Sequence, residues 1–306
     1  MAHRYPEKLA DSSFDNTGLL LEAPYRPHLN NSVLLTVDLT KAVADEAIAR
    51  KDSIIIAYHP IIFRPLKSFT LANTQQNSLL RLAQEGISVY SPHTAVDAAV
   101  GGLNDWLADI VTCKDYENPS EGQEPQTTRS VITPVKDPLQ GFEQAGYGRI
   151  VKYQTPVELG TIVQRIMRGL KIQDGMSVAT PQAVPAGQKS QIKISSIGIC
   201  AGSGGSLLNG LDVDLLFTGE LSHHEALAAI EQGKCVVTVF HSNSERGFLN
   251  QRMAVDLMIA INHSQSDGEF ADIPKNWSQT GGIAVSQADR DPYSVFSKTV
   301  LDGGQW

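Results

Sequence analysis

The run Cys235–Phe240, CVVTVF, is followed directly by His241 and, after the polar turn Ser242–Ser244, by Glu245. Apolar and β-branched residues follow one another in this run without the alternation of a half-exposed strand. Such a run is typical of a strand that is covered on both faces. It favours a sheet packed between helices, with a histidine and a carboxylate just past the end of one strand.

Five further apolar runs have a similar composition, and helical patterns separate several of them. They are SVLLTVDL (Ser32–Leu39), SIIIAY (Ser53–Tyr58), ISVYS (Ile87–Ser91), KISSIGIC (Lys193–Cys200) and VDLLFTG (Val213–Gly219). The helical pattern of Thr70–Gly86 ends in a glycine that suits a helix C-cap. Strands that alternate with helices predict an α/β fold with a largely parallel sheet.

The segment 114–140 interrupts this alternation. It begins KDYENPSEGQEPQTTR and is polar, without periodicity, so we interpret it as a linker or an exposed loop. Shortly after it, Thr155–Glu158 has the spacing of a helix capping box. A chain of 306 residues is long enough for two lobes of ordinary size. We predict a first lobe of residues 1–113 with 237–306, and a second lobe of residues 141–236.

The composition excludes several classes of protein. Hydrophobic residues make up 42% of the chain and charged residues 19%, which is typical of a globular protein. The net charge is −8, and the chain has no long run of lysine and arginine. The sequence therefore does not predict nucleic-acid binding. The chain also has no run of about 18 apolar residues, the length that would predict a membrane span. The cysteines, Cys113, Cys200 and Cys235, favour a reducing, cytoplasmic compartment, with the nucleus and mitochondria left open.

Histidine and carboxylate side chains follow four of the predicted strands. They are His59 after SIIIAY, His93 and Asp97 after ISVYS, Glu220 with His223 and His224 after VDLLFTG, and His241 with Glu245 after CVVTVF. Ligands of open α/β sheets bind at the carboxyl ends of the strands. We therefore expect these side chains to converge on one site.

Imidazole and carboxylate without thiolate form a ligand set that suits zinc, manganese, iron, cobalt or nickel. His241 and Glu245 can share one ion if the turn between them brings both to one side, and Asp97 can reach the same point from another strand. A carboxylate can also bridge two ions about 3.5–4 Å apart, as in two-metal hydrolases. Glu220, His223 and His224 are candidates for acid–base groups or for residues that orient the ligands.

Simpler structural roles remain open for several of these residues. The spans Ser242–Glu245 and Ser222–Glu225 both have capping-box spacing. His59 precedes a proline and could simply end a strand. The glycine-rich stretch Gly202–Gly205 either forms a nest of N–H groups that holds an anion or makes a tight turn.

Four blocks of the chain resemble, in order, the signature blocks of the NIF-three-like family, whose members are also catalogued as GTP cyclohydrolase I type 2 homologues. The blocks are YHPIIFRPLK (58–67), HTAVDAAVGGLND (93–105), GELSHHEAL (219–227) and FHSNSERGFL (240–249). FDNTGLLL (14–21) and DRDPYSVF (289–296) are similar to the terminal blocks of the family. The resemblance covers almost the whole chain and is to the eukaryotic type, which lacks a larger inserted domain.

The resemblance implies two intertwined α/β repeats with mixed, largely parallel sheets, assembled into a homo-hexameric ring. It implies two divalent metal ions per subunit, with ligands that carry over to His59, Asp97, His241 and Glu245. Many bacterial members have a histidine where this chain has Tyr58, so one ligand of one ion is replaced. His93 matches a motif residue without a defined role.

The names of the family imply two different functions. One is hydrolysis of a nucleotide or phosphoester at a two-metal site, as in a GTP cyclohydrolase. The other is binding of a transcriptional co-regulator by a metal-stabilised protein without significant catalysis.

Overall fold

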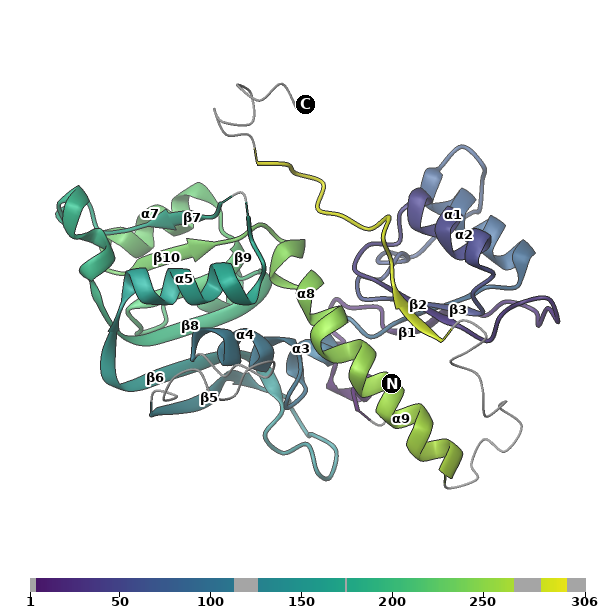
Figure 1. Ribbon diagram of the computed structural model, residues 1–306, viewed down its shortest axis with the longest axis horizontal. Coiled ribbons are helices and arrows are strands. Elements are labelled where there is room, and N and C mark those ends of the chain that lie inside the picture. The colour runs from purple at the N-terminus through teal and green to yellow at the C-terminus, as the bar shows by residue number, and fades with distance from the viewer. Residues whose placement is uncertain (1–3, 113–125, 174, 267–281, 296–306) are drawn as a thin grey trace. The chain divides into compact units, whose positions relative to one another are not determined.

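The computed structural model describes residues 4–112, 126–173, 175–266 and 282–295 (Figure 1). The chain divides into two compact units: a first unit of residues 1–99 with 248–290, and a second unit of residues 100–247 with 291–306. It therefore passes from one unit to the other after Ala99, after Gly247 and after Arg290. This connectivity confirms the expectation of two intertwined α/β halves.

The first unit contains a five-stranded sheet. Its order is β1 (Gly18–Leu21), β4 (Ser88–Ser91), β3 (Ile54–Ala57), β2 (Val33–Thr36) and β11 (Ile283–Val285). All neighbouring pairs are parallel except β1 and β4, so this sheet is largely parallel, as predicted. Its other elements are η1 (Glu7–Leu9), α1 (Lys41–Arg50), α2 (Thr74–Glu85), α3 (Thr94–Ala98), the π-helical turn η4 (Leu249–Met253) and α9 (Ala254–Ser266).

Local sequence signals fix the two helices that lie together over this sheet in Figure 1, α1 and α2. Thr40 caps α1, because its side chain accepts a hydrogen bond from the amide of Val43. Asn73 caps α2 in the same way, and Gly86 ends it with φ +88°, which confirms the predicted glycine C-cap. Apolar residues of β2, β3 and β4 and of both helices form the core beneath them.

The second unit contains a six-stranded mixed sheet. Its order is β5 (Thr127–Pro134), β6 (Gly146–Glu158), β8 (Lys193–Ser203), β9 (Leu215–Glu220), β10 (Cys235–Thr238) and β7 (Ser177–Ala179). The pairs β8–β9 and β9–β10 are parallel, and the outer pairs are antiparallel. Its helical elements are α4 (Leu103–Val111), α5 (Leu159–Gly169), η2 (Ala186–Gln191), α6 (Gly205–Leu208), α7 (His223–Glu231) and η3 (Ser242–Ser244); α8 (Arg246–Phe248) lies at the boundary of the two units.

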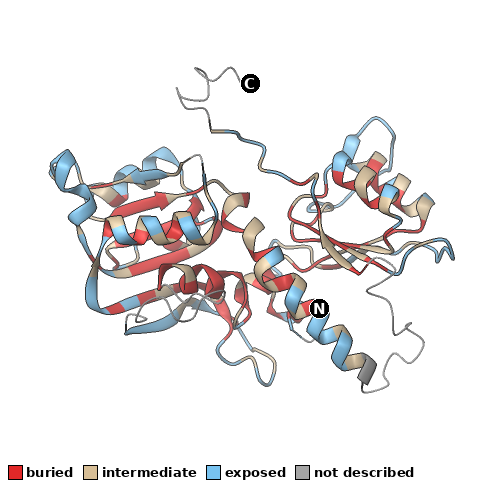
Figure 2. Ribbon diagram, in the orientation of Figure 1, coloured by how far each residue is buried: buried red, intermediate tan, exposed pale blue. Residues whose placement is uncertain are grey.

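Strand β9 of the second unit is buried on both faces (Figure 2). Leu215 to Gly219 of β9 are all buried, as a continuous apolar run requires. Leu216 and Val236 form a core cluster with Ala229 of α7, while α4 and α5 pack against each other and on β6. Within the described ranges, no helix is both long enough and apolar enough to cross a membrane.

Two local expectations differ from the structure. Residues 114–125 of the predicted linker lie outside the described residues, but Thr127–Pro134 form strand β5. Most of β5 is exposed at the edge of the sheet, so its sequence lacks the apolar run that marks a central strand. The expected capping box at Thr155–Glu158 is wrong, because β6 continues to Glu158 and α5 starts at Leu159 without a side-chain cap. The two lobe boundaries stay a prediction, which limited proteolysis can test.

Candidate metal centre

In the second unit, His241 lies between two carboxylates. β9 and β10 are parallel neighbours, so Glu220 at the end of β9 and His241 beyond β10 meet at the same sheet edge. The Nδ1 atom of His241 is 2.9 Å from Oε1 of Glu220. Its Nε2 atom is 3.4 Å from Oε1 of Glu245, whose side chain is only 3% exposed. The turn therefore does bring His241 and Glu245 to one side.

Serine side chains hold this turn in shape. The hydroxyl of Ser244 donates to the carbonyl oxygen of His241 (2.6 Å) and accepts from the amide of Gly202 (2.8 Å). The alternative of a capping box at Ser242–Glu245 is wrong, because η3 starts after His241 without a side-chain cap. The box at Ser222–Glu225 is confirmed at the start of α7. Glu225 thus has a capping role.

Gly202, at the end of β8, provides space for both of these side chains. A Cβ atom at this position would lie 2.7 Å from Oε1 of Glu245 and 2.8 Å from Nε2 of His241. Its φ of +61° also disfavours any other residue. The glycine-rich stretch therefore allows the close approach of ligand-type side chains, which neither of its two sequence interpretations included.

Gly202→Ala is expected to weaken divalent-metal binding, because the added methyl group displaces His241 and Glu245. The left-handed backbone adds a loss of roughly 1–2 kcal/mol in the free energy of unfolding. Gly210→Ala is the matched control: Gly210 also has a positive φ (+77°), but nothing lies within 4 Å of its virtual Cβ. Urea unfolding should show the backbone cost in both variants and a larger loss in Gly202→Ala, because only there does the methyl group meet other side chains. Calorimetric titration with Co²⁺ should show a loss of affinity in Gly202→Ala alone. Equal affinities would contradict this prediction.

In the first unit, two more histidines each pair with a carboxylate. The Nδ1 atom of His59 is 2.9 Å from Oδ1 of Asp38, and Nδ1 of His93 is 2.7 Å from Oδ1 of Asp15. β3 and β4 are parallel neighbours, which places both histidines at the same edge of their sheet. His93 has φ +32°, which is uncommon outside glycine. The two imidazole rings contact each other with centroids 5.5 Å apart.

The three histidines share one arrangement. In each, Nδ1 lies within hydrogen-bond distance of a carboxylate oxygen. When the neutral ring donates its Nδ1–H to that oxygen, Nε2 carries the lone pair that can bind a ligand. Histidines that bind metals typically use one ring nitrogen for the metal and donate the other N–H to a carboxylate. The donor set of this chain therefore fits a divalent metal ion.

Asp15, whose carboxylate pairs with His93, stays ionised. Burial alone would raise the pKa of Asp15, but hydrogen bonds from His93 and Thr94, together with the charge of His93, hold the pKa below its usual value of 3.8. The hydroxyl and the amide of Thr94 both donate to Asp15. Asp15 therefore remains a hydrogen-bond acceptor for His93 across the neutral range.

Tyr58 is buried beside these residues. Its hydroxyl donates to Oδ1 of Asp97 (2.6 Å), and its ring lies 5.0 Å from the ring of His59 and 5.5 Å from that of His93, between centroids. Tyr58 thus orients Asp97 through a hydrogen bond. Asp97 follows His93 on α3, within the first unit.

The remaining candidates separate into two groups. Glu220 contacts His241, as a residue that orients a ligand should. His223 and His224 lie in the first turn of α7, are exposed, and contact each other with ring centroids 5.3 Å apart. Sequence reasoning missed Asp38 and Asp15. Asp38 follows the run SVLLTV and satisfies the strand-end rule, whereas Asp15 precedes a strand and gives no such signal.

Fold and side chains together define a mixed α/β protein of two intertwined units with carboxylate-paired histidines at the sheet edges. A model of the Duf34/NIF3 (NGG1p interacting factor 3) family matches residues 1–273. The chain belongs to this family.

Relatives and solved structures agree with this assignment. The Protein NIF3 homolog of Schizosaccharomyces pombe is 45% identical over 95% of this chain and 94% of its own length. The NGG1-interacting factor 3 of Saccharomyces cerevisiae is 42% identical over 95% and 93%. A Bacillus cereus protein related to NIF3 has a similar fold, with a TM-score of 0.70 at 19% identity over 96% of both chains.

Proposed function

We propose that the protein binds divalent metal ions through His59, Asp97, His241 and Glu245 and hydrolyses a nucleotide or phosphoester, in the manner of a GTP cyclohydrolase. The carboxylate pairing of the histidines supports this proposal most strongly. His59 in the first unit, and His241 and Glu245 in the second, each offer one ligand atom. We further propose two ions per subunit, with Glu245 shared between them. The nitrogen and oxygen donors suit zinc, manganese, iron, cobalt or nickel.

The residues of the chain prepare the site in distinct ways. Asp38 and Glu220 hold the imidazoles of His59 and His241 in one tautomer and orientation. The buried charge of Glu245 attracts cations, and Tyr58 orients Asp97. Divalent ions, when bound, supply Lewis-acid activation of water and of a phosphoryl oxygen.

We assign acid–base roles to the residues around His241 as part of the same proposal. Glu220 is a candidate through its contact with His241. His223 and His224 are exposed at the start of α7 and are candidates for a proton donor to the leaving group.

A screen of nucleotides and phosphoesters tests the proposal. We expect hydrolysis that a chelator abolishes and that one of the five metals restores, because the metal activates the attacking water. His241→Ala should lack activity under every condition. Absence of hydrolysis by the metal-loaded protein on all substrates of the screen would contradict the catalytic part.

A second candidate function is binding of a transcriptional co-regulator by a metal-stabilised protein without significant catalysis. The name of the Saccharomyces cerevisiae relative, NGG1-interacting factor 3, supports it. This function would place the protein in the nucleus as well as the cytoplasm. Specific capture of the co-regulator by an inactive Glu245 variant would favour it, and lack of capture by the intact protein would exclude it.

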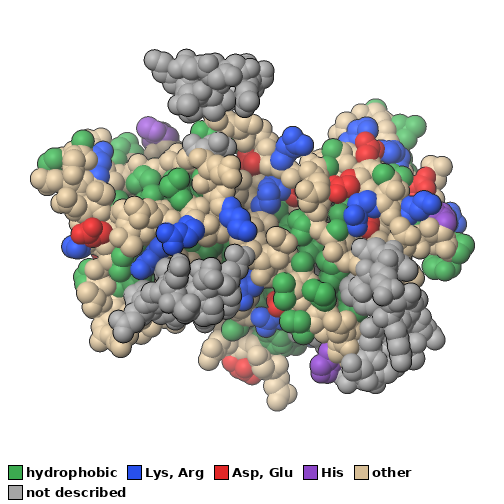
Figure 3. Space-filling model, viewed as in Figure 1, with side chains coloured by type: hydrophobic (Ala, Val, Ile, Leu, Met, Phe, Trp, Pro, Cys, Tyr) green, Lys and Arg blue, Asp and Glu red, His purple; other side chains and the backbone are tan. Residues whose placement is uncertain are grey.

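We also propose that the protein is a homo-oligomer, in keeping with the hexamer that the family resemblance implies. Val255, Met258 and Ile259 are 44%, 45% and 60% exposed on one side of α9. Apolar side chains are visible over this helix in Figure 3. A second copy of the chain would bury them. Sedimentation that shows only monomer at micromolar concentration would contradict this proposal.

A further inference from the structure

The segment Asp291–Tyr293 returns to the second unit and contacts the turn that carries His241. The hydroxyl of Ser242 donates to Oδ2 of Asp291 at 2.7 Å. The ring of Tyr293 stacks on the ring of Phe240, with centroids 6.0 Å apart and an interplanar angle of 28°. Both residues adjacent to His241 in the chain are therefore held by this one segment.

The backbone of Phe240 needs such support. Its φ is +68°, a left-handed conformation that is unusual for a bulky residue. A strained conformation of this kind persists only where the surroundings hold it in place. The stacked ring of Tyr293 provides a contact of this type, directly before His241.

Ser242 forms the second anchor. Its side chain is buried, and its hydroxyl accepts a hydrogen bond from Nη2 of Arg246 (2.8 Å) while it donates to Asp291. The other carboxylate oxygen of Asp291 accepts from the amide of Tyr293 at 2.8 Å. Asp291 thereby fixes Ser242 and Tyr293 at the same time, and so restrains both sides of His241.

We propose that Asp291 and Tyr293 are positioning residues that hold the imidazole of His241 where its Nε2 atom and the carboxylate of Glu245 bind the same ion. The inference rests on the proposed metal site. Asp291 acts through Ser242, and Tyr293 acts through Phe240, the two neighbours of His241 in the chain.

Metal affinity tests this inference. Zn²⁺ affinity is measured by competition with a chromophoric chelator for the wild type, Tyr293→Ala, Asp291→Ala and Tyr293→Phe. We expect the two alanine variants to bind about 10- to 100-fold more weakly, as for other residues that orient metal ligands. Tyr293→Phe keeps the stacked ring and should bind Zn²⁺ with the affinity of the wild type. Tyr25→Ala removes a tyrosine that is 81% exposed and should have no effect. Wild-type affinity in both alanine variants would overturn the inference.

Hydrogen exchange separates this inference from the proposed function. The amides of residues 239–245 should exchange faster in Tyr293→Ala than in the wild type or in Tyr25→Ala, with or without metal. A wild type that binds no metal would refute the metal site, while the exchange rates would still test the positioning. Unchanged exchange in Tyr293→Ala would overturn the positioning. Because Tyr293 is 71% exposed, its truncation leaves the core of the unit intact.

Discussion

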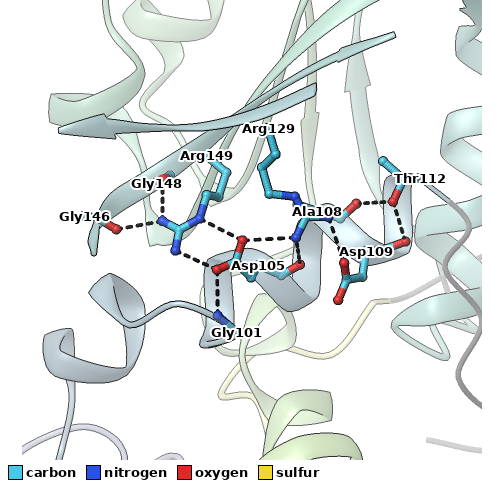
Figure 4. A network of polar contacts seen from close by, with 9 residues as sticks. All are labelled: Gly101, Asp105, Ala108, Asp109, Thr112, Arg129, Gly146, Gly148 and Arg149. Atoms are coloured by element: carbon cyan, nitrogen blue, oxygen red, sulfur yellow. Dashed lines mark hydrogen bonds and ion pairs between the residues drawn. The ribbon is translucent and has the colours of Figure 1, made fainter. Parts of the chain in front are cut away.

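Replacement of Arg149 by leucine is expected to lower the free energy of unfolding by about 3–5 kcal/mol, the usual effect of removing one partner of a buried ion pair. The side chain of Arg149 is only 3% exposed. Its Nε and Nη2 atoms donate to the two carboxylate oxygens of Asp105 at 2.9 and 2.7 Å (Figure 4). Its Nη1 atom donates to the carbonyl oxygens of Gly146 and Gly148 at 2.7 and 2.8 Å.

The same network contains a matched control. Arg129 pairs with Asp105 and Asp109 at 3.0 and 2.7 Å, but its side chain is 29% exposed (Figure 4). Arg129→Leu should therefore cost less than Arg149→Leu. In Arg149→Leu/Asp105→Leu, part of the stability should return, because the buried carboxylate that lost Arg149 is gone. Urea unfolding that shows similar, small losses for both arginine variants would contradict a structural role for this network.

The pKa of Asp105 agrees with this role. Burial would raise its pKa, but the hydrogen bonds and charge of Arg149, with further help from Gly101 and Arg129, hold it below the usual value of 3.8. A lowered folded-state pKa contributes stability that is present above the unfolded pKa. That stability is lost as the pH falls through the lowered folded-state pKa. In Arg149→Leu, the acid-induced loss of stability should start at higher pH.

Replacement of Glu245 by glutamine is expected to reduce the proposed hydrolysis by orders of magnitude and to remove at least one bound ion. The substitution keeps the shape of the side chain and removes a negative charge that is buried 3.4 Å from Nε2 of His241. A shared carboxylate holds two ions at the spacing needed for attacking and leaving oxygens. Rates of hydrolysis measured at saturating metal check this prediction.

A control variant shows whether the effect comes from the metal ligand itself or from the loss of one negative charge anywhere on the protein. Glu231→Gln makes the same chemical change at an exposed position at the end of α7 and should leave metal binding and hydrolysis unchanged. Melting temperatures of both variants show whether the fold survives. Equal hydrolysis by both would mean that Glu245 is not a ligand.

The sequence predicts the positions of the buried strands better than those of the exposed ones. The apolar runs that became β3, β9 and β10 are recognisable because most residues on both faces of these strands are buried. β5 was not recognisable, because side chains at a sheet edge need not be apolar. The sequence predicts a capping box at Thr155–Glu158, but α5 starts at Leu159. Pairing of β6 with β8 keeps residues up to Glu158 in the strand and overrides the local capping signal.

The candidate site divides in the same way. Glu220 ends a strand, and His59, His93 and His241 come shortly after the ends of strands, so the strand-end rule finds them. Asp15, Gly202 and Tyr293 act through contacts between segments that are distant in the sequence. Such contacts depend on tertiary structure and leave no periodic pattern in the chain.

Metal content is the most direct test of the metal site. The wild type and Glu245→Gln are each dialysed to equilibrium against Zn²⁺, Mn²⁺, Fe²⁺, Co²⁺ or Ni²⁺, and the bound metal is counted by elemental analysis. We predict about two ions per wild-type chain with at least one of these metals, the count expected of a two-metal site, and at least one ion fewer in Glu245→Gln. A wild type that retains no ion, or a Glu245→Gln variant with full occupancy, would contradict the proposed site.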